Sequence, residues 1–254
     1  MHGLRLAGVR VIAYASRTGT RSTLAALRSA GWRLLVSAAG ELRTEGFRYA
    51  LDNGAWSAHQ AGQPFDEAAF LRALDLLGRD ADFVVAPDIV QGGEASLELT
   101  WRWMQRVLNV AAVALIAVQD GHEPWQVDEI LGARIGIFIG GSTEWKLATM
   151  AQWGAAAARR GAWCHVGRVN TRRRVLACAA AGVTSFDGTS VTKFPSTLPL
   201  LEAARDFGER QGDLLRSYHP IDPAVDAPIT PRRSGRRGFD AQPAPRHGTT
   251  DEEP

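Results

Sequence analysis

The stretch DFVVAPDIVQGGEASLELTWRWMQRVLNVAAVALIAVQ, residues 82–119, decides the fold. Its two ends, 82–88 and 113–119, are short apolar runs, and continuous runs of this kind are typical of strands buried on both faces. Between them, residues 94–110 place apolar side chains at helical spacing. Two buried strands joined by a helix indicate a parallel strand–helix–strand unit, because parallel neighbours need a crossover connection of about this length.

The same alternation continues in both directions along the chain. Helical runs follow most of the strands, among them PWQVDEILG (124–132) after the fifth. The second strand, however, leads into the third through ELRTEG (41–46), which is too short for a full helix. Such a pattern fits a doubly wound sheet or a barrel, and eight strands over about 200 residues favour the (β/α)₈ TIM barrel. We therefore predict a barrel domain over 1–216. Its strands are expected at 10–16, 32–38, 47–52, 82–88, 113–119, 135–140, 163–168 and 183–188.

The composition changes at about Ser217. Seven of the twelve prolines lie within 220–254, apolar clusters stop, and RRSGRR at 232–237 is a basic run. We predict that 217–254 is a disordered Pro/Arg-rich tail. Such a tail is either merely solvated or an arm that touches phosphates.

The bulk composition excludes several classes of protein. The chain has two cysteines, too few for a disulfide framework or a four-cysteine zinc site. The start of the chain lacks the long apolar stretch of a signal peptide, and no run approaches the ~20 apolar residues of a membrane span. A net charge of +2 neither demands nor excludes a nucleic acid. We expect a cytoplasmic protein with no membrane partner.

Acidic residues recur where predicted strands end. Asp52, Asp88 and Asp187 close three strands, the fifth strand ends in Gln119-Asp120-Gly121, and the sixth ends in Gly140-Gly141-Ser142. In a TIM barrel these strand ends meet at one mouth, where active sites lie. A single aspartate there is commonly a turn former or a helix cap. Three around one mouth would repel one another, so at least one should have a perturbed pKa.

The residue types restrict the possible reactions but do not identify a single one. The sequence contains no cysteine–histidine cluster, so the chemistry is carried by carboxylates. It is either metal-assisted, or acid–base and nucleophilic at a sugar carbon.

Five segments together resemble a known superfamily. LDNGAW (51–56), VAPDIV (85–90), VQDG (118–121), FIGGS (138–142) and HVGRVNTRRRVLACAAAGVTSFDGTS (165–190) occur in the order and spacing of the tRNA-guanine transglycosylases. The chain is most similar to the short phage-type DNA 7-deazaguanine transglycosylases (DpdA-like). The resemblance implies a pentosyltransferase that replaces guanine in DNA by a queuosine-related 7-deazaguanine derivative such as 7-cyano-7-deazaguanine.

The resemblance also implies a role for each matching residue. Asp187 matches the nucleophilic aspartate that attacks the anomeric carbon of the sugar. Asp52 matches the aspartate that handles protons during base exchange. The implied substrate-binding residues are Asp88, which recognises the base, with Gln119, Gly140, Gly141, Asn53 and Gly54.

These roles agree with the chemistry of a guanine-like base. Its N1–H and exocyclic amine lie side by side, so one carboxylate can accept both. As the base leaves, the sugar becomes oxocarbenium-like, and a carboxylate at the anomeric carbon stabilises that charge and can trap it covalently. The target nucleotide has to leave the base stack to reach a barrel mouth.

Several other residues allow two interpretations, one functional and one structural. Arg168, Arg172, Arg173 and Arg174 surround the start of a predicted helix, where cations oppose the helix dipole, so they either contact phosphates or form a solvated face. His165 ends the seventh strand and is either a pocket residue or a hydrogen-bonded core residue.

The chain departs from the tRNA enzymes in one respect. Their three-cysteine, one-histidine zinc site has no counterpart after Cys178. This departure favours DNA over tRNA, and we expect neither a zinc site nor a cofactor for the chemical step, in the cytoplasm of a bacterial or phage-infected cell. The alternatives are a tRNA-guanine transglycosylase without its zinc module, a carboxylate-dependent glycoside hydrolase, and a base-binding protein without catalysis. A homodimer is compatible with the sequence.

Overall fold

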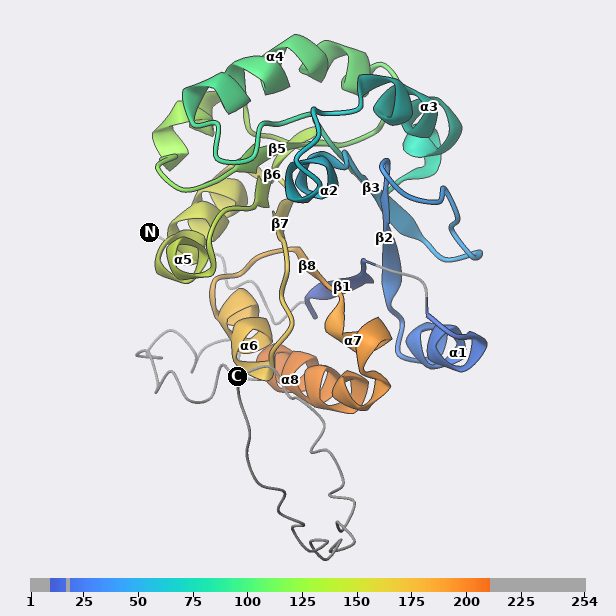
Figure 1. Ribbon diagram of the computed structural model, residues 1–254. Coiled ribbons are helices and arrows are strands. Elements are labelled where there is room, and N and C mark those ends of the chain that lie inside the picture. The colour runs from blue at the N-terminus through green and yellow to red at the C-terminus, as the bar shows by residue number, and fades with distance from the viewer. Residues whose placement is uncertain (1–9, 17–18, 211–254) are drawn as a thin grey trace, which may run out of the picture.

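The computed structural model describes residues 10–16 and 19–210. In this part of the chain eight parallel strands pair in chain order and close into a barrel (Figure 1). The predicted TIM barrel is therefore confirmed, whereas the tail predicted over 217–254 lies outside the described residues. The strands are β1 (Ile12–Ala15), β2 (Arg33–Ser37), β3 (Tyr49–Asp52), β4 (Val84–Val85), β5 (Ala114–Val118), β6 (Ile135–Ile139), β7 (Cys164–Val166) and β8 (Ser185–Gly188).

Helices surround the barrel as an outer ring (Figure 1). Residue choice explains their ends: Thr20 caps the first helix through a hydrogen bond from the Thr23 amide, and Gly161 ends the longest one in a left-handed conformation. The α-helices are α1 (Arg21–Ser29), α2 (Ala55–Gln60), α3 (Glu67–Leu77), α4 (Glu94–Leu108), α5 (Thr143–Arg160), α6 (Arg172–Ala180), α7 (Ser190–Lys193) and α8 (Leu198–Arg210).

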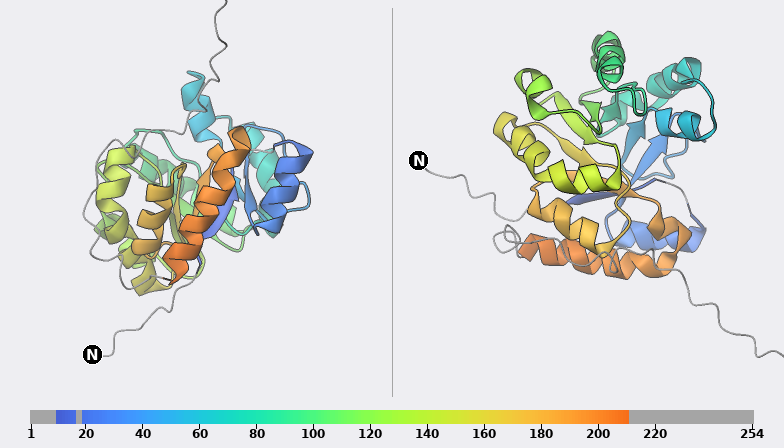
Figure 2. Two further views of the ribbon diagram at one scale, coloured as in Figure 1. Left: turned by 90° about the horizontal axis from the view of Figure 1, so that it is seen from below. Right: turned by 60° about the vertical axis from the view of Figure 1, so that its left-hand side comes forward.

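Two segments differ from the sequence prediction. The run 124–132 was expected to be helical, but it forms two short 3₁₀ turns, Pro124–Gln126 and Asp128–Ile130. Val127 between them has a φ of −129°, which interrupts the helical path. The short helix α2 was not expected, and in Figure 2 it projects from one end of the barrel.

Side chains alternate between the two faces of each strand, and this alternation separates an apolar cluster inside the barrel from one between the barrel and the helices. Tyr14, Phe83 and Leu115 belong to the cluster that fills the barrel, and their outward neighbours pack against the helices. Because side chains alternate with a period of two, residues two positions apart share a face. Asp52 therefore shares the inward face of Ala50, and Asp187 shares the face of Ser185.

The opposite end of the barrel holds a carboxylate with a structural role. Asp82 accepts hydrogen bonds from the Tyr14 hydroxyl at 2.9 Å and from Arg33 at 2.8 Å, and it also pairs with Arg48. Two arginines neutralise this aspartate, so its ion pairs explain its presence there. Among the described helices, none combines the length and the apolar character needed to cross a membrane.

Candidate active site

Asp187 lies at the end of β8 and is held by three donors. The residue is only 4% exposed. Its Oδ1 accepts from His165 Nε2 and from the backbone N–H of Arg168, each at 3.2 Å, and its Oδ2 accepts from the Ser16 hydroxyl. Burial raises the pKa of Asp187, but the hydrogen bonds from His165, Ser16 and the Arg168 amide outweigh it and hold the pKa below its ordinary value. Asp187 is therefore ionised at neutral pH.

Asp52 ends β3, and its pKa is shifted in the direction opposite to that of Asp187. Burial is the main cause that raises its pKa to about 7, and the negative charges of Asp187 and Asp88 raise it further. The Gly54 N–H donates to its Oδ2 at 3.1 Å and opposes this rise. The structure thus provides two aspartates at one mouth, one ionised and one that exchanges a proton near neutrality.

Asp88 follows β4 and is positioned by a neighbouring amide. Asn53 is buried, and its Nδ2 donates to Asp88 Oδ1 and to the Ala86 carbonyl, both at 2.7 Å. Burial raises the pKa of Asp88 to about 6, although the hydrogen bond from Asn53 lowers it. The negative charges of both Asp187 and Asp88 act on Asp52 and raise its pKa. The structure therefore brings the three carboxylates predicted from the sequence to one site.

The backbone conformation at this site requires a glycine at position 54. Its φ is +86°, and a Cβ placed there would lie 2.9 Å from both the Cβ and the backbone nitrogen of Ala39. We expect Gly54→Ala to lower the free energy of unfolding by about 2 kcal/mol or more, since backbone strain and a clash add together. Urea denaturation measures this loss.

A second glycine provides the control for that variant. Gly62 has a φ of +64° and no atoms within 4 Å of its would-be Cβ. Gly62→Ala should therefore show the backbone strain alone, about 1 kcal/mol. Equal losses in the two variants would contradict a role for the close approach to Ala39.

Gln119 and the Gly140–Gly141 pair lie at the mouth, where Gln119 and the Gly140 N–H already have partners. Gln119 Oε1 accepts from the Gln91 N–H and its Nε2 donates to the Ile89 carbonyl, both at 2.7 Å. The Gly140 N–H donates to the Val118 carbonyl at 2.8 Å. Gln119 thus fixes the loop that follows Asp88. Contact of the Gly140 N–H with a base requires its hydrogen bond to open, whereas Gln119 keeps a second amide hydrogen and a second lone pair.

Asp120 has a structural role despite its place at a strand end. Its carboxylate accepts from the Ser142 hydroxyl and N–H, both at 2.6 Å. Gly141 permits this contact, because a Cβ there would lie 2.4 Å from Asp120 Oδ2. Asp120 therefore stabilises the turn between β6 and α5 through these two hydrogen bonds.

Arg168 connects distant parts of the mouth. From the end of β7 it reaches α2, where its guanidinium carbon lies 4.2 Å from the ring centroid of Trp56, and it donates to the Gly141 carbonyl. β7 and β3 are not neighbours in the barrel, so the side chain crosses the mouth. The other three predicted arginines lie in the first turn of α6, where Arg172 is exposed and Arg173 and Arg174 are half-buried.

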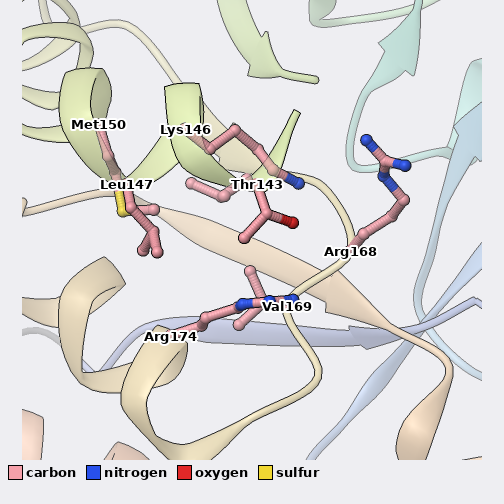
Figure 3. A pocket seen from close by; sticks show the side chains of 8 residues that line it. Thr143, Lys146, Leu147, Met150, Arg168, Val169 and Arg174 are labelled. Atoms are coloured by element: carbon pink, nitrogen blue, oxygen red, sulfur yellow. The ribbon is translucent and has the colours of Figure 1, made fainter. Parts of the chain in front are cut away.

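A small pocket lies between α5, the end of β7 and α6, and none of the three site aspartates lines it (Figure 3). Lys146 and Thr143 face Val169 and Arg174 across it, and Arg168 extends away from them (Figure 3). Lys146 is buried and donates to the Gly167 carbonyl at 2.5 Å. Burial lowers its pKa to about 8, and the charge of Arg168 lowers it further. A lysine inside an amphipathic helix gives no sequence signal of burial, so sequence reasoning missed it.

Within residues 10–16 and 19–210, no three His, Cys, Asp or Glu side chains are arranged to hold a metal ion. The expectation that the chemical step needs no cofactor stays a prediction.

Comparison with known proteins does not identify a family for this chain. No family model and no curated protein matches the chain. Similar solved structures include tryptophan synthase from M. tuberculosis in an aminoacrylate-bound form, at a TM-score of 0.49 and 13% identity over 80% of this chain and 93% of that one. A ligand-free variant of the same enzyme gives a TM-score of 0.48 at 13% identity, with the same coverage. Similarities at this level say nothing about reaction or substrate, and the resemblance to the transglycosylases stays a prediction.

Proposed function

We propose that this protein is a base-exchange transglycosylase that replaces guanine in DNA by a 7-deazaguanine derivative through a covalent intermediate on Asp187. One observation carries the proposal: a buried, ionised aspartate shares the barrel mouth with a second aspartate whose pKa is about 7. Covalent exchange at a sugar carbon needs a nucleophile that stays ionised and a partner that both gives and takes a proton.

The first half-reaction expels guanine. A carboxylate oxygen of Asp187 forms a bond to the anomeric carbon while the bond from that carbon to N9 breaks, and the electron pair of the broken bond passes to N9. Protonated Asp52 donates its proton to the leaving base, so guanine departs neutral. The charge that develops on the sugar is stabilised by the carboxylate that traps it.

The second half-reaction reverses the proton transfer. The incoming 7-deazaguanine gives the proton of its N9–H to ionised Asp52, and N9 attacks the anomeric carbon. The bond to Asp187 breaks and the carboxylate is regenerated. Both side chains end in their starting protonation states, and two displacements retain the configuration of the sugar.

Asp88 is assigned to recognition of the base. It can accept the N1–H and the exocyclic amine of a guanine-like ring when it is ionised. Asn53 holds one of its oxygens at 2.7 Å and so fixes the carboxylate for this contact. Below pH 6 Asp88 becomes protonated, because its pKa is about 6, and the KM for the base should then rise.

The nucleic-acid partner is supported by positive charge beside the mouth. Arg168 follows β7, and Arg172, Arg173 and Arg174 form the first turn of α6. Phosphate contacts would offset the unfavourable placement of cations at a helix N-terminus. A flipped nucleotide entering the mouth would also have to displace the Arg168 guanidinium from Trp56 or stack beside it.

Labelled base and two nucleic acids test the proposal. The purified chain is incubated with 7-cyano-7-deazaguanine carrying a radiolabel and with duplex DNA or unmodified tRNA. We expect label in DNA, with release of one guanine for each base incorporated.

The other outcomes identify the competing functions. Label in tRNA alone would show a tRNA transglycosylase, and release of guanine without incorporation would show a hydrolase. Binding of the base with neither exchange nor release would show a base-binding protein. Each of these results would overturn the assignment to DNA base exchange.

A further inference from the structure

His165 lies beside Asp187 in the wall of the barrel interior. It is fully buried, and its Nε2 is 3.2 Å from Asp187 Oδ1. Its other ring nitrogen, Nδ1, is 2.8 Å from the hydroxyl of Ser185. The chemical steps proposed above leave this histidine without a task, although it touches the nucleophile.

The neighbours of Ser185 determine which nitrogen of His165 carries the proton. The indole N–H of Trp163 donates to Ser185 Oγ at 2.7 Å. An indole N–H can only donate, so Ser185 Oγ uses a lone pair there and its single proton is available for His165 Nδ1. Because ionised Asp187 can only accept, the proton of the neutral ring lies on Nε2 and points at Asp187, and Nδ1 accepts from Ser185.

The surroundings keep the ring neutral. Tyr14 from β1, Phe83 beside β4 and Phe138 from β6 pack against it with ring centroids 5.6, 5.0 and 5.1 Å away. The charged groups that act on it are Asp187 from β8 and Lys146 from α5. Burial lowers the pKa of His165 and outweighs the hydrogen bond that the ring donates to Asp187 and the negative charge of Asp187, which both raise it. At neutral pH the ring is therefore a hydrogen-bond donor without a net charge.

This arrangement makes the two oxygens of Asp187 unequal. Oδ1 accepts two N–H groups, from His165 and the Arg168 backbone, whereas Oδ2 accepts the Ser16 hydroxyl, which can rotate away. An oxygen that accepts two fixed donors is the weaker nucleophile, so Oδ2 is the oxygen presented to the sugar. A protonated histidine would instead neutralise Asp187 and weaken both oxygens.

We propose that His165 is a positioning residue, held as the neutral Nε2–H tautomer by the Trp163–Ser185 pair, that orients Asp187 and keeps it ionised for attack through Oδ2. The role in catalysis rests on the proposed function, because it requires Asp187 to be the nucleophile. The tautomer itself does not depend on that function.

The tautomer can be measured in the wild-type protein alone. Nitrogen-15 NMR of the side chains distinguishes a protonated from an unprotonated ring nitrogen, and the spectrum of His165→Gln identifies the signal among the six histidines of the chain. We expect an unprotonated Nδ1 and a protonated Nε2 that do not change between pH 7 and 9. A ring that titrates in this range, or that carries its proton on Nδ1, overturns the proposal whether or not the protein exchanges bases.

Substitutions test the effect on Asp187. His165→Gln keeps an N–H donor near the position of Nε2, whereas His165→Phe keeps only the ring shape. We expect the phenylalanine variant to lose about 10- to 100-fold in kcat with little change in KM, since it removes a hydrogen bond to a charged group, and the glutamine variant to recover most of this loss. At saturating substrate, the acid limb of kcat should move to higher pH in His165→Phe, because the pKa of Asp187 rises without its donor.

Two further variants keep the test decisive. Ser185→Ala removes the hydroxyl that fixes the tautomer, and it should lower kcat and shift the same limb if His165→Phe does not fold. His122 is a second buried histidine, but its ring nitrogens bond the Gln119 N–H and the Gly93 carbonyl. His122→Phe should leave the acid limb in place. Equal kcat losses in the Gln and Phe variants of His165, or an unmoved acid limb in both His165→Phe and Ser185→Ala, would show that the residue serves packing alone.

Discussion

Asp187→Asn should abolish the covalent enzyme–nucleic acid adduct and reduce base exchange by on the order of 10⁴-fold or more, as removal of a nucleophile generally does. The amide has the shape of the carboxylate but lacks the charge that attacks the sugar. Its oxygen can still accept from His165 and the Arg168 N–H, and its NH₂ group can donate to the Ser16 hydroxyl, so the fold should survive. A denaturing gel with labelled DNA and a thermal unfolding curve measure the two effects.

A neighbouring aspartate supplies the control for this variant. Asp120 lies at the same mouth, but its carboxylate fastens the Ser142 turn rather than meeting a substrate. Asp120→Asn should still form the adduct. If Asp187→Asn forms it as well as the wild-type protein does, Asp187 is not the nucleophile, and the proposed exchange through this residue fails.

Asp52→Asn should slow exchange while making the protein more stable above neutral pH. General acid–base catalysis contributes about 10²- to 10⁴-fold, and both half-reactions use Asp52, so a loss in that range is expected. In the wild-type protein, kcat/KM should fall as the pH rises through about 7, because expulsion of guanine needs the protonated form of Asp52. This alkaline limb should disappear in the variant.

The stability effect follows from the raised pKa. In the folded protein the pKa of Asp52 is about 7, against an ordinary value of 3.8, so folding favours the protonated form. The stabilisation from Asp52 is complete below pH 4 and is lost as the pH rises through 7. Asparagine cannot ionise, so at pH 8 the variant should exceed the wild type in free energy of unfolding by about 4 kcal/mol. At pH 4 the two should be nearly equal.

Urea denaturation at pH 4 and pH 8 measures this difference. Asp66→Asn is the matched control, because Asp66 is the exposed N-cap of α3 and asparagine caps a helix about as well. It should change stability little at either pH. A wild-type protein that is as stable as Asp52→Asn at pH 8 would show that Asp52 carries no raised pKa, and the proton-transfer role would lose its physical basis.

Much of the architecture can be read from local patterns. Continuous apolar runs marked most of the eight strands, because a strand covered on both faces leaves no polar side in its sequence. The segment after β5 misled the prediction, since Pro124 starts a turn that Val127 interrupts. The unexpected helix α2 begins after Gly54, where a left-handed residue breaks the strand without a side-chain cap.

Placement of the acidic residues also followed from the sequence. Parallel strands in a barrel all end at the same mouth, so position at a strand end was enough to gather Asp52, Asp88 and Asp187. The same rule also selected Asp120, which instead binds the Ser142 turn. A rule based on position along a strand gives the location of a side chain but not its partner.

The sequence by itself determined the barrel and the ring of strand ends, because both follow from periodicities of a few residues. Only the tertiary structure decided which carboxylate is ionised and which holds a proton. Ser16 and Asp187, which share a hydrogen bond, are 171 residues apart in the chain. The sequence left His165 as either a pocket residue or a core residue, and only the structure shows its contact with Asp187. A pKa depends on burial and on the distances to charges and donors, and the closed barrel sets these distances between segments that no local pattern connects.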